Sequence, residues 1–432
     1  MKVQIFEQFK GGHCTNYIQY LLPTLVKLID EKVIDEIVVT LTPDHFTSEP
    51  FHQQLASYSE RVHFDPYLPE VHQNLSLDPN LIMRQPGQIA SAMQRRAEIA
   101  SNLINAVHRV KPDYLISTTA DPQSMTLATN AFLGRETLTK AIHSVGIIHY
   151  GYSGAAVNVI DQMKDFVYRS VWKYSPWSRL LVVNPLVYES LSARGNLLAK
   201  RIGLVPDPVP PSMYFDKKTA RNLLKIPTDG RYIGFVGTID HRMAIPELVA
   251  AFRDATLSST DRLLLAGRIL PQYKKLIENE FTELLDCERV ILLDQYLDVD
   301  ELMAGFCALD IASILYYKKP NLSANLLKAL AAQRPVIANN FGYTGMIVRR
   351  FDVGWSCDVL NHRDLVETLT RGLEESLSYR FNEKVTRLIQ FHHPENYAET
   401  VLMDLRNIVT PGYATQVRTW EWVLNSDSPD PS

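Results

Sequence analysis

Long hydrophobic runs, paired cysteines and blocks of one charge are all missing from this sequence of 432 residues. No run of 18 apolar residues occurs, so no segment is long enough to cross a membrane. The start, MKVQIFEQFKGG, lacks the apolar core of a signal peptide. The four cysteines form no C-x-x-C pair, which argues against a zinc site or a disulfide framework. We therefore expect a cytoplasmic protein, while peripheral membrane contact, which needs only a small patch, stays open.

The charge balance excludes a further class of partner. The formal net charge is −4, and no Lys/Arg block is long enough for a nucleic-acid footprint, so no nucleic-acid partner is expected.

Three common catalytic or nucleotide-binding motifs, G-x-S-x-G, H-E-x-x-H and the P-loop, are absent from the sequence. With 46% hydrophobic residues, the chain has material for two domains of about 200 residues each, as in a folded enzyme or binding protein.

Short apolar runs alternate with helical patterns through the first half of the chain. Strands are expected at Val3–Phe6, Ile34–Leu41, Asp113–Ser117, Val145–Ile148 and Leu180–Asn184, and helices at Asn16–Ile29, Gln88–Val110, Ser124–Leu133 and Leu186–Ala193. This alternation predicts a parallel sheet with helices on both faces, which is an α/β fold.

A proline-rich segment, GLVPDPVPPS at Gly203–Ser212, is the best candidate for a domain boundary, although an ordinary surface loop is the alternative. The alternation then starts again. Strands are expected at Tyr232–Val236, Arg262–Ala266, Val290–Leu293, Leu309–Ile314 and Pro335–Ala338, and helices at Ile245–Asp254, Gln272–Leu285, Glu301–Cys307 and Ser323–Ala332. A second doubly wound sheet is the simplest interpretation.

Two such sheets in tandem form a cleft, and open α/β sheets bind ligands beyond the carboxyl ends of their strands. Glycines stand at two of these ends: Gly11 and Gly12 after the first strand, and Gly237 after Val236. A backbone without side chains lets a diphosphate or sugar approach closely, although plain turn glycines are the alternative. The residues alone thus predict a cleft protein for an anionic or nucleotide-like ligand.

A series of segments in a fixed order carries a family resemblance. It runs IGLVPDPV, ARNLLKIP, YIGFVGTIDHRMAIPELVAAF, LLAGRI, VILLDQYLDVDELMAGFCALDIASIL and NLLKALAAQRPVIANNFGYTGMIV. Together with the early GGH and IIHYGYSG segments, it resembles the retaining GT-B glycosyltransferases of the sucrose-synthase and group 1 type (family 4-like). The resemblance extends from Lys2 to about Asp358 and is weakest between Thr42 and Gln88.

The resemblance implies two Rossmann-like doubly wound domains facing across a cleft (GT-B). Residues 1–203 would form the acceptor-side domain and residues 204–395 the donor domain for the sugar nucleotide. Residues 396–432 would add a helix that returns to the first domain and a disordered tail. Within them, TWEWVL at Thr419–Leu424 is expected to pack on the first domain or on another chain.

The resemblance also assigns cations to the donor diphosphate. Thr238 stands where relatives carry an arginine, and Met243 stands at their lysine. Arg242, one residue earlier, is expected to take the phosphate role, and Arg268 is a second candidate. His149 follows a strand and is expected to face the donor sugar. Arg242 and His149 are the predicted catalytic residues; a solvated arginine and a structural histidine are the alternatives.

The helix Ser323–Ala332 departs from the family pattern. Relatives carry two glutamates eight residues apart, and here Pro320 and Lys328 occupy those positions. A lysine has no acceptor atom, so Lys328 cannot bind ribose hydroxyls as a carboxylate does, but it can pair with an anion. Ser323, Asn325 and the first amides of this helix are expected to bind an anion, with a simple N-cap as the alternative.

Two further segments complete the predicted donor site. Phe341–Gly345 matches a glycine loop of the family, so the backbone at Gly342, Tyr343 and Thr344 is expected to meet sugar or phosphate, unless the segment is only a turn. His13, beside Gly11 and Gly12, is also a candidate for donor binding.

The resemblance implies a retaining glycosyltransferase that uses a nucleotide-sugar as substrate and no cofactor. No Asp-x-Asp pair suggests a metal–diphosphate site, so no obligatory metal is expected. The acceptor stays open among small molecules, glycans, lipids and proteins, and so does a homodimer. Pro320 and Lys328 favour an alternative, a non-catalytic sugar-nucleotide or glycan-binding or scaffold protein; a nucleotide-sugar epimerase is a weaker third hypothesis.

Overall fold

The computed structural model describes residues 1–9, 14–69, 86–149, 159–192, 198–209, 214–317, 323–412 and 417–425. The chain forms two compact units, each built on one parallel sheet. The first unit contains residues 1–208 and 395–417, and the second contains residues 209–394 and 418–430. Each unit therefore takes its last segment from the C-terminal part of the chain.

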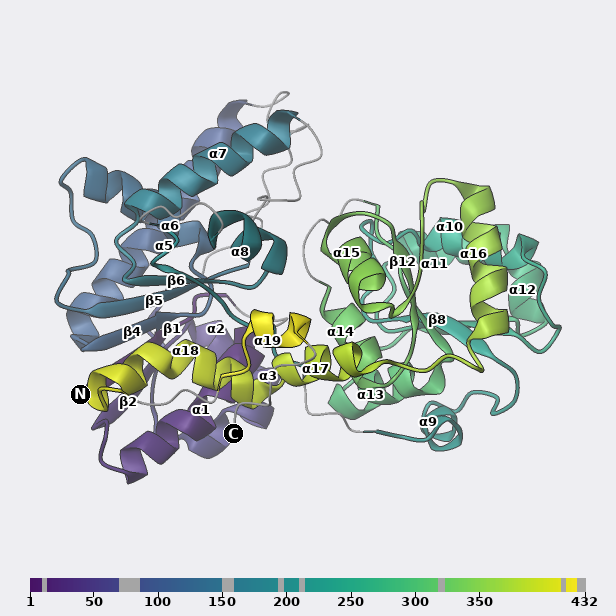
Figure 1. Cartoon of the computed structure of the whole chain (residues 1–432), viewed down its shortest axis with the longest axis horizontal. Helices are drawn as coiled ribbons and strands as arrows, with labels where there is room; N and C mark the ends of the chain where they lie inside the picture. The colour runs from purple at the N-terminus through teal and green to yellow at the C-terminus, as the bar shows by residue number, and fades with distance from the viewer. Residues whose placement is uncertain are drawn as a thin grey trace. The chain divides into compact units, whose positions relative to one another are not determined.

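The first unit is a seven-stranded sheet in the order β3-β2-β1-β4-β5-β6-β7. Its strands are β1 (Lys2–Phe6), β2 (Glu36–Thr40), β3 (His63–Asp65), β4 (Tyr114–Ser117), β5 (His143–Ile148), β6 (Arg179–Val182) and β7 (Ile202–Leu204). Its helices are α1 (Cys14–Asp30), α2 (Pro43–Phe46), α3 (Glu49–Gln54), the 3-10 turn η1 (Ala56–Tyr58), α5 (Pro86–Val110), α6 (Asp121–Phe132), α7 (Val159–Tyr174), α8 (Pro185–Ser192) and α18 (Pro394–Val409). Helices α5, α6 and α7 cover one face of the sheet, and α1 and α18 cover the other (Figure 1).

The second unit is a six-stranded sheet in the order β10-β9-β8-β11-β12-β13. Its strands are β8 (Tyr232–Val236), β9 (Arg262–Ala266), β10 (Val290–Leu293), β11 (Ile311–Ile314), β12 (Val336–Asn339) and β13 (Gly354–Cys357). Its helices are α9 (Lys217–Leu223), α10 (Ile245–Asp254), α11 (Pro271–Glu280), α12 (Thr282–Asp286), α13 (Val299–Ala308), α14 (Ala324–Ala331), α15 (Gly342–Phe351), α16 (His362–Glu375), α17 (Glu383–Phe391) and α19 (Trp420–Leu424).

These two sheets confirm the predicted fold class. Strands β4, β8 and β11 are buried along their whole length, as expected when helices cover both faces of a parallel sheet. In each sheet the strand order reverses once, between β1 and β4 in the first unit and between β8 and β11 in the second. The crevice at such a reversal is where doubly wound sheets bind ligands, and the reversals therefore direct attention to the ends of these four strands.

Some elements were not predicted from the sequence. Strands β3 and β7 have three residues each, which is too short for a periodic signal. Helix α7 was not predicted either: its apolar residues Val159, Met163 and Phe166 follow the helical i, i+4, i+7 spacing but are exposed rather than part of the core.

Helix α19, the centre of TWEWVL, lies in the second unit. This placement contradicts the predicted packing on the first domain, while packing on another chain stays a prediction. The buried ring of Trp420 lies 5.6 Å from the ring centre of Phe391 and 5.8 Å from that of Phe351. Thr419 caps the helix by accepting a hydrogen bond from the Trp422 amide. The alternating tryptophans thus serve as anchors for this helix.

Asp404 fastens α18 to the first unit by accepting hydrogen bonds from Arg179 at 2.8 Å and from His143 at 3.2 Å. Burial opposes ionisation, but these two partners outweigh it and hold the pKa of Asp404 below its ordinary value. The carboxylate therefore stabilises the folded unit at neutral pH.

Asp404→Asn is expected to lower the free energy of unfolding by about 1–2 kcal/mol at pH 7. Because the folded-state pKa is lowered, this contribution is present above about pH 4 and is lost as the pH falls through the folded-state value. Urea unfolding of both proteins between pH 7 and pH 3 measures the difference, which should narrow as the pH falls. A difference that stays constant would show that packing, and not charge, accounts for it.

Candidate donor and acceptor edges

The candidate donor edge lies where β8 and β11 end in the second sheet. The segment after β8, residues 237–244, is held from both sides by backbone hydrogen bonds. On one side the Ile239 amide donates to the Arg268 carbonyl at 2.9 Å. On the other, the Tyr317 amide donates to the Arg242 carbonyl at 3.0 Å, and the Ala244 amide donates to the Leu315 carbonyl at 3.2 Å. The segment is therefore fixed before any ligand arrives.

Two glycines keep this edge free of side chains. Gly237 and Gly267 follow β8 and β9 with φ of 132° and 125°, a region that favours glycine. A Cβ at Gly267 would lie 2.2 Å from the Gly237 carbonyl oxygen. A Cβ at Gly237 would lie 3.0 Å from the Asn325 side-chain nitrogen. Only bare backbone fits at this position.

Arg242 lies in the fixed segment with its backbone held and its side chain 55% exposed. Its guanidinium forms a bidentate pair with Asp240, with hydrogen bonds of 2.7 Å and 2.9 Å. Burial opposes ionisation of Asp240, but the bonds from Arg242 hold its pKa below the ordinary value. The predicted phosphate cation therefore already has an anionic partner, which sequence reasoning did not include.

The neighbouring candidates at this edge differ in exposure. Thr238 and Arg268 are exposed at the ends of β8 and β9. Met243 is buried, so the position of the family lysine is filled by a core side chain. Arg242 and Arg268 are thus the two arginines that the predicted donor set contributes here.

Helix α14 is fixed to the same edge by Asn325, whose side-chain NH₂ donates to the Val236 carbonyl at 3.0 Å. Ser323, just before the helix, is fully buried and its hydroxyl pairs with the Tyr316 hydroxyl at 3.1 Å. The Ser323 side chain does not cap the helix, so the N-cap alternative does not apply to its hydroxyl. Lys328 lies half-buried in the second turn, whereas Pro320 lies outside the described residues.

The predicted glycine loop is the first turn of a helix. Helix α15 begins at Gly342, which has a φ of 63°. Tyr343 and Thr344 are fully buried as whole residues, so their side chains belong to the core of the second unit. A Cβ at Gly345 would lie 2.4 Å from the Asn340 carbonyl carbon, which explains this second glycine by close packing.

The corresponding edge of the first unit carries His149, just after β5. Its amide donates to the Asp121 carboxylate at 2.9 Å, and its Nε2 lies 2.8 Å from the Thr118 carbonyl oxygen. A carbonyl only accepts, so Nε2 carries a hydrogen, and in the neutral ring Nδ1 keeps its lone pair. The ring also lies 5.1 Å from that of Tyr17. Gly11, Gly12 and His13 lie outside the described residues.

Glu7, directly after β1, is a site candidate that the sequence analysis missed. Its side chain is 1% exposed and accepts hydrogen bonds from the Phe9 amide at 2.8 Å, the Thr118 hydroxyl at 2.6 Å and the Thr119 hydroxyl at 2.8 Å. Burial raises the pKa of the Glu7 carboxyl, although these donors act in the opposite direction. Its position directly after a buried strand was the signal available in the sequence.

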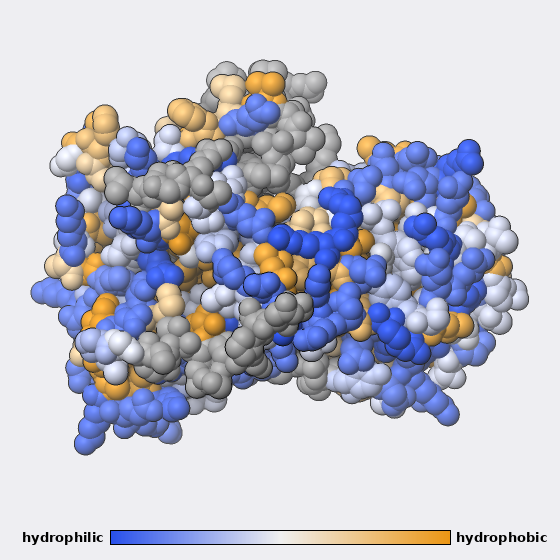
Figure 2. All heavy atoms as spheres, in the orientation of Figure 1, coloured by the Kyte–Doolittle hydropathy of each residue, from blue (hydrophilic) through white to orange (hydrophobic). Residues whose placement is uncertain are grey.

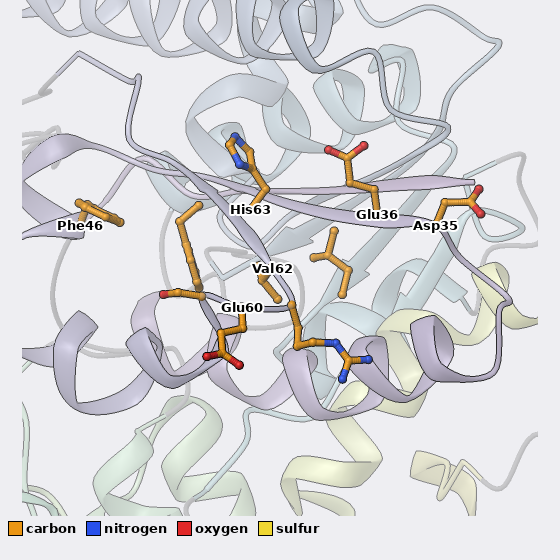
Figure 3. Close-up of a pocket in the computed structure, with 10 residues that line it drawn as sticks. Asp35, Glu36, Phe46, Glu60, Val62 and His63 are labelled. Atoms are coloured by element: carbon orange, nitrogen blue, oxygen red, sulfur yellow. The ribbon is translucent and has the colours of Figure 1, made fainter.

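Figure 3 shows an open hollow elsewhere on the first unit, lined by residues that include Asp35, Glu36 and His63. Glu36 and His63 begin β2 and β3, so the hollow lies at the amino ends of these strands. Two of its three acids have partners, because Asp35 pairs with the N-terminus and Glu36 pairs with Lys2. The hollow is therefore not a candidate for the donor.

Within the part of the chain that the structure describes, no helix is both long and apolar enough to cross a bilayer. On the face seen in Figure 2, apolar side chains are scattered among hydrophilic ones. Within the same residues, no group of three His, Cys, Asp or Glu side chains is arranged to hold a metal ion. Independence from metal remains a prediction.

Comparison with known proteins finds one family match within the second unit. Residues 216–390 match the model for glycosyl transferases group 1. No curated protein sequence matches the chain.

Solved structures match nearly the whole chain. Sucrose-phosphate synthase from Thermosynechococcus elongatus matches with a TM-score of 0.65 at 14% identity, over 94% of this chain and 98% of that one. A glycosyltransferase from Rickettsia africae matches with 0.61 at 13% identity, over 95% and 99%. HepE from Anabaena, solved with UDP-glucose, matches with 0.54 at 13% identity, over 94% and 100%. Identities this low establish the fold alone.

Proposed function

We propose that this chain transfers a sugar from a nucleotide-sugar to an acceptor, because residues 216–390 match the model for glycosyl transferases group 1 and the chain has the GT-B fold. The observation that carries this proposal is the donor edge at the end of β8. There the bare backbone of Gly237 lies against Asn325 of α14, and Arg242 is held in the same segment. HepE, which has this fold, was solved with UDP-glucose, and this supports a donor of that class.

In this proposal the diphosphate binds at the donor edge. The first amides of α14 and the guanidinium of Arg242 would neutralise it, with Arg268 as a second cation. Gly237 would allow the close approach that a side chain would prevent. These groups are the reason for proposing catalysis without a metal. His149 would accept a hydrogen bond from a sugar hydroxyl through Nδ1. Retention of configuration is proposed from the family resemblance alone.

A second function, non-catalytic binding of a sugar-nucleotide or glycan, is favoured by two observations. Lys328 replaces a carboxylate that, in relatives, accepts hydrogen bonds from ribose hydroxyls. Arg242 is already paired with Asp240. The lysine removes a contact to the ribose of the donor, and the pairing of Arg242 leaves less positive charge to stabilise the leaving diphosphate.

Release of free nucleotide separates the two functions. Purified protein is incubated with UDP-, GDP-, ADP- and dTDP-sugars in EDTA, and thermal unfolding is followed in parallel. We expect one donor both to stabilise the protein and to release its nucleotide slowly. Stabilisation without release, with acceptor mixtures present, would favour the binding protein. Release that requires added Mg²⁺ would contradict independence from metal, and a protein stabilised by none of these ligands would contradict both functions.

A further inference from the structure

We propose that Glu7 is a positioning residue for sugar transfer, holding His149 in place through Thr118. This inference rests on the proposed function, in which His149 binds the sugar. It adds a residue from β1 to a site whose other members come from the family pattern.

The link runs through two short hydrogen bonds in the first unit. The Thr118 hydroxyl donates to Glu7 at 2.6 Å, and the Thr118 carbonyl oxygen lies 2.8 Å from Nε2 of His149. Thr119 donates a second hydroxyl to the same carboxylate oxygen of Glu7 at 2.8 Å. The carboxylate therefore fixes the residue whose carbonyl selects the tautomer of His149. This is the relation between a base and the group that orients it.

The position of Glu7 in the sheet fits this role. Strands β1 and β4 are the two neighbours between which the strand order reverses, and Glu7 and Thr118 follow their carboxyl ends. A carboxylate at this point joins three adjacent strand ends, those of β1, β4 and β5. Such a connection maintains the geometry of the edge at which doubly wound sheets bind ligands.

Folding alone does not account for a charge at this position. Glu7 is buried, and among the described residues no lysine or arginine forms an ion pair with it. The ionisable groups near it are His149 after β5, Cys14 on α1 and Tyr397 on α18, and Asp121 of α6 binds the His149 amide. Of these, His149 acts on Glu7 in the direction that favours its carboxylate form. A neutral glutamine would avoid the cost of burying a charge, but its side-chain NH₂ could not accept the hydrogen bonds that the two threonine hydroxyls donate to the carboxylate.

The first test compares the stability of Glu7→Gln with that of Asp404→Asn, both in the full-length protein. Because the folded-state pKa of Glu7 is raised, stability falls as the pH rises from the ordinary carboxyl value to the folded-state value, and the full cost is present above the latter; the neutral variant avoids that cost. At pH 8 we expect Glu7→Gln to unfold at or above the wild-type temperature, by about 1–3 °C. Asp404→Asn, which also removes a carboxylate bonded near a histidine, should unfold at a lower temperature. A Glu7→Gln protein that unfolds below wild type would overturn the inference, because Glu7 would then serve folding.

The second test measures nucleotide release with the donor identified above. For Glu7→Gln and for Thr118→Val we expect kcat to fall about tenfold or more, with KM within about threefold of wild type. The double variant should lose no more than the larger single loss, because both changes break one link. Asp404→Asn should keep the wild-type kcat. Wild-type kcat in Glu7→Gln, or multiplied losses in the double variant, would overturn the role of Glu7. No release by wild type would instead overturn the proposed function, and the unfolding temperatures would still test whether Glu7 serves folding.

Discussion

Gly267→Ala is expected to abolish nucleotide binding and to lower the free energy of unfolding by about 4 kcal/mol. The residue has a φ of 125°, and its new Cβ would lie 2.2 Å from the oxygen and 2.7 Å from the carbon of the Gly237 carbonyl. Backbone cannot rotate away as a flexible side chain can, so β8 and β9 must separate at their carboxyl ends. The segment that carries Arg242 begins at Gly237. The Ile239 amide in this segment would lose its hydrogen bond to the Arg268 carbonyl.

Urea unfolding and titration with the stabilising nucleotide measure the two effects of Gly267→Ala. Gly134→Ala is the matched control, because Gly134 also has a positive φ, of 64°, but no atom lies within 4 Å of the position that its new Cβ would take. That variant should lose only about 1 kcal/mol and keep its nucleotide affinity. Equal losses in the two variants would mean that backbone conformation matters and that the contact with Gly237 does not.

Opposite effects are expected from the two members of the Asp240–Arg242 pair. Arg242→Ala should lower nucleotide release about 10- to 100-fold, since a charge-assisted hydrogen bond to phosphate contributes about 1.5–3 kcal/mol. Asp240→Asn should tighten nucleotide binding about threefold or more, because the guanidinium would no longer be neutralised by the bidentate carboxylate at 2.7 Å and 2.9 Å. The direction of each change follows from the charge of the side chain removed.

Titration calorimetry and the release assay test this pair. Arg253 and Asp254 form a control pair, since they too are an exposed arginine and aspartate with a hydrogen bond of 2.8 Å, here at the end of α10. Arg253→Ala and Asp254→Asn should leave nucleotide affinity unchanged. If Arg242→Ala also leaves release unchanged, Arg242 is an ordinary solvated arginine. Weaker binding in Asp240→Asn would mean that the carboxylate orients Arg242 more than it neutralises it.

The sequence predicted the fold better than the site, for a physical reason. Buried parallel strands such as β8 and β11 appear in the sequence as continuous apolar runs, and their predicted bounds nearly match those in the structure. The direction of a polar side chain has no such local signal. Tyr343 and Thr344 follow a turn glycine and yet lie in the core, and only their three-dimensional surroundings determine this.

The pairing of candidate residues shows the same limit. Arg242 was found as a cation, but Asp240 was not considered as its partner, although it lies two residues away. Glu7 was overlooked because its partners Thr118 and Thr119 are more than one hundred residues distant in the chain. A site assembled from the ends of separate strands becomes visible only when the strand order is known.

The division of the chain into units limits how the two domains can be separated into fragments. The chain passes from one unit to the other after residues 208, 394 and 417. A fragment that ends at residue 394 would therefore lack α18 from the first unit and α19 from the second. No single cut of the chain yields two complete units. During synthesis the first unit is complete only after α18 has been made, and the second only after α19 has been made. Each half of the sequence shows the strand and helix pattern of one sheet, but neither half alone contains all the residues of one unit.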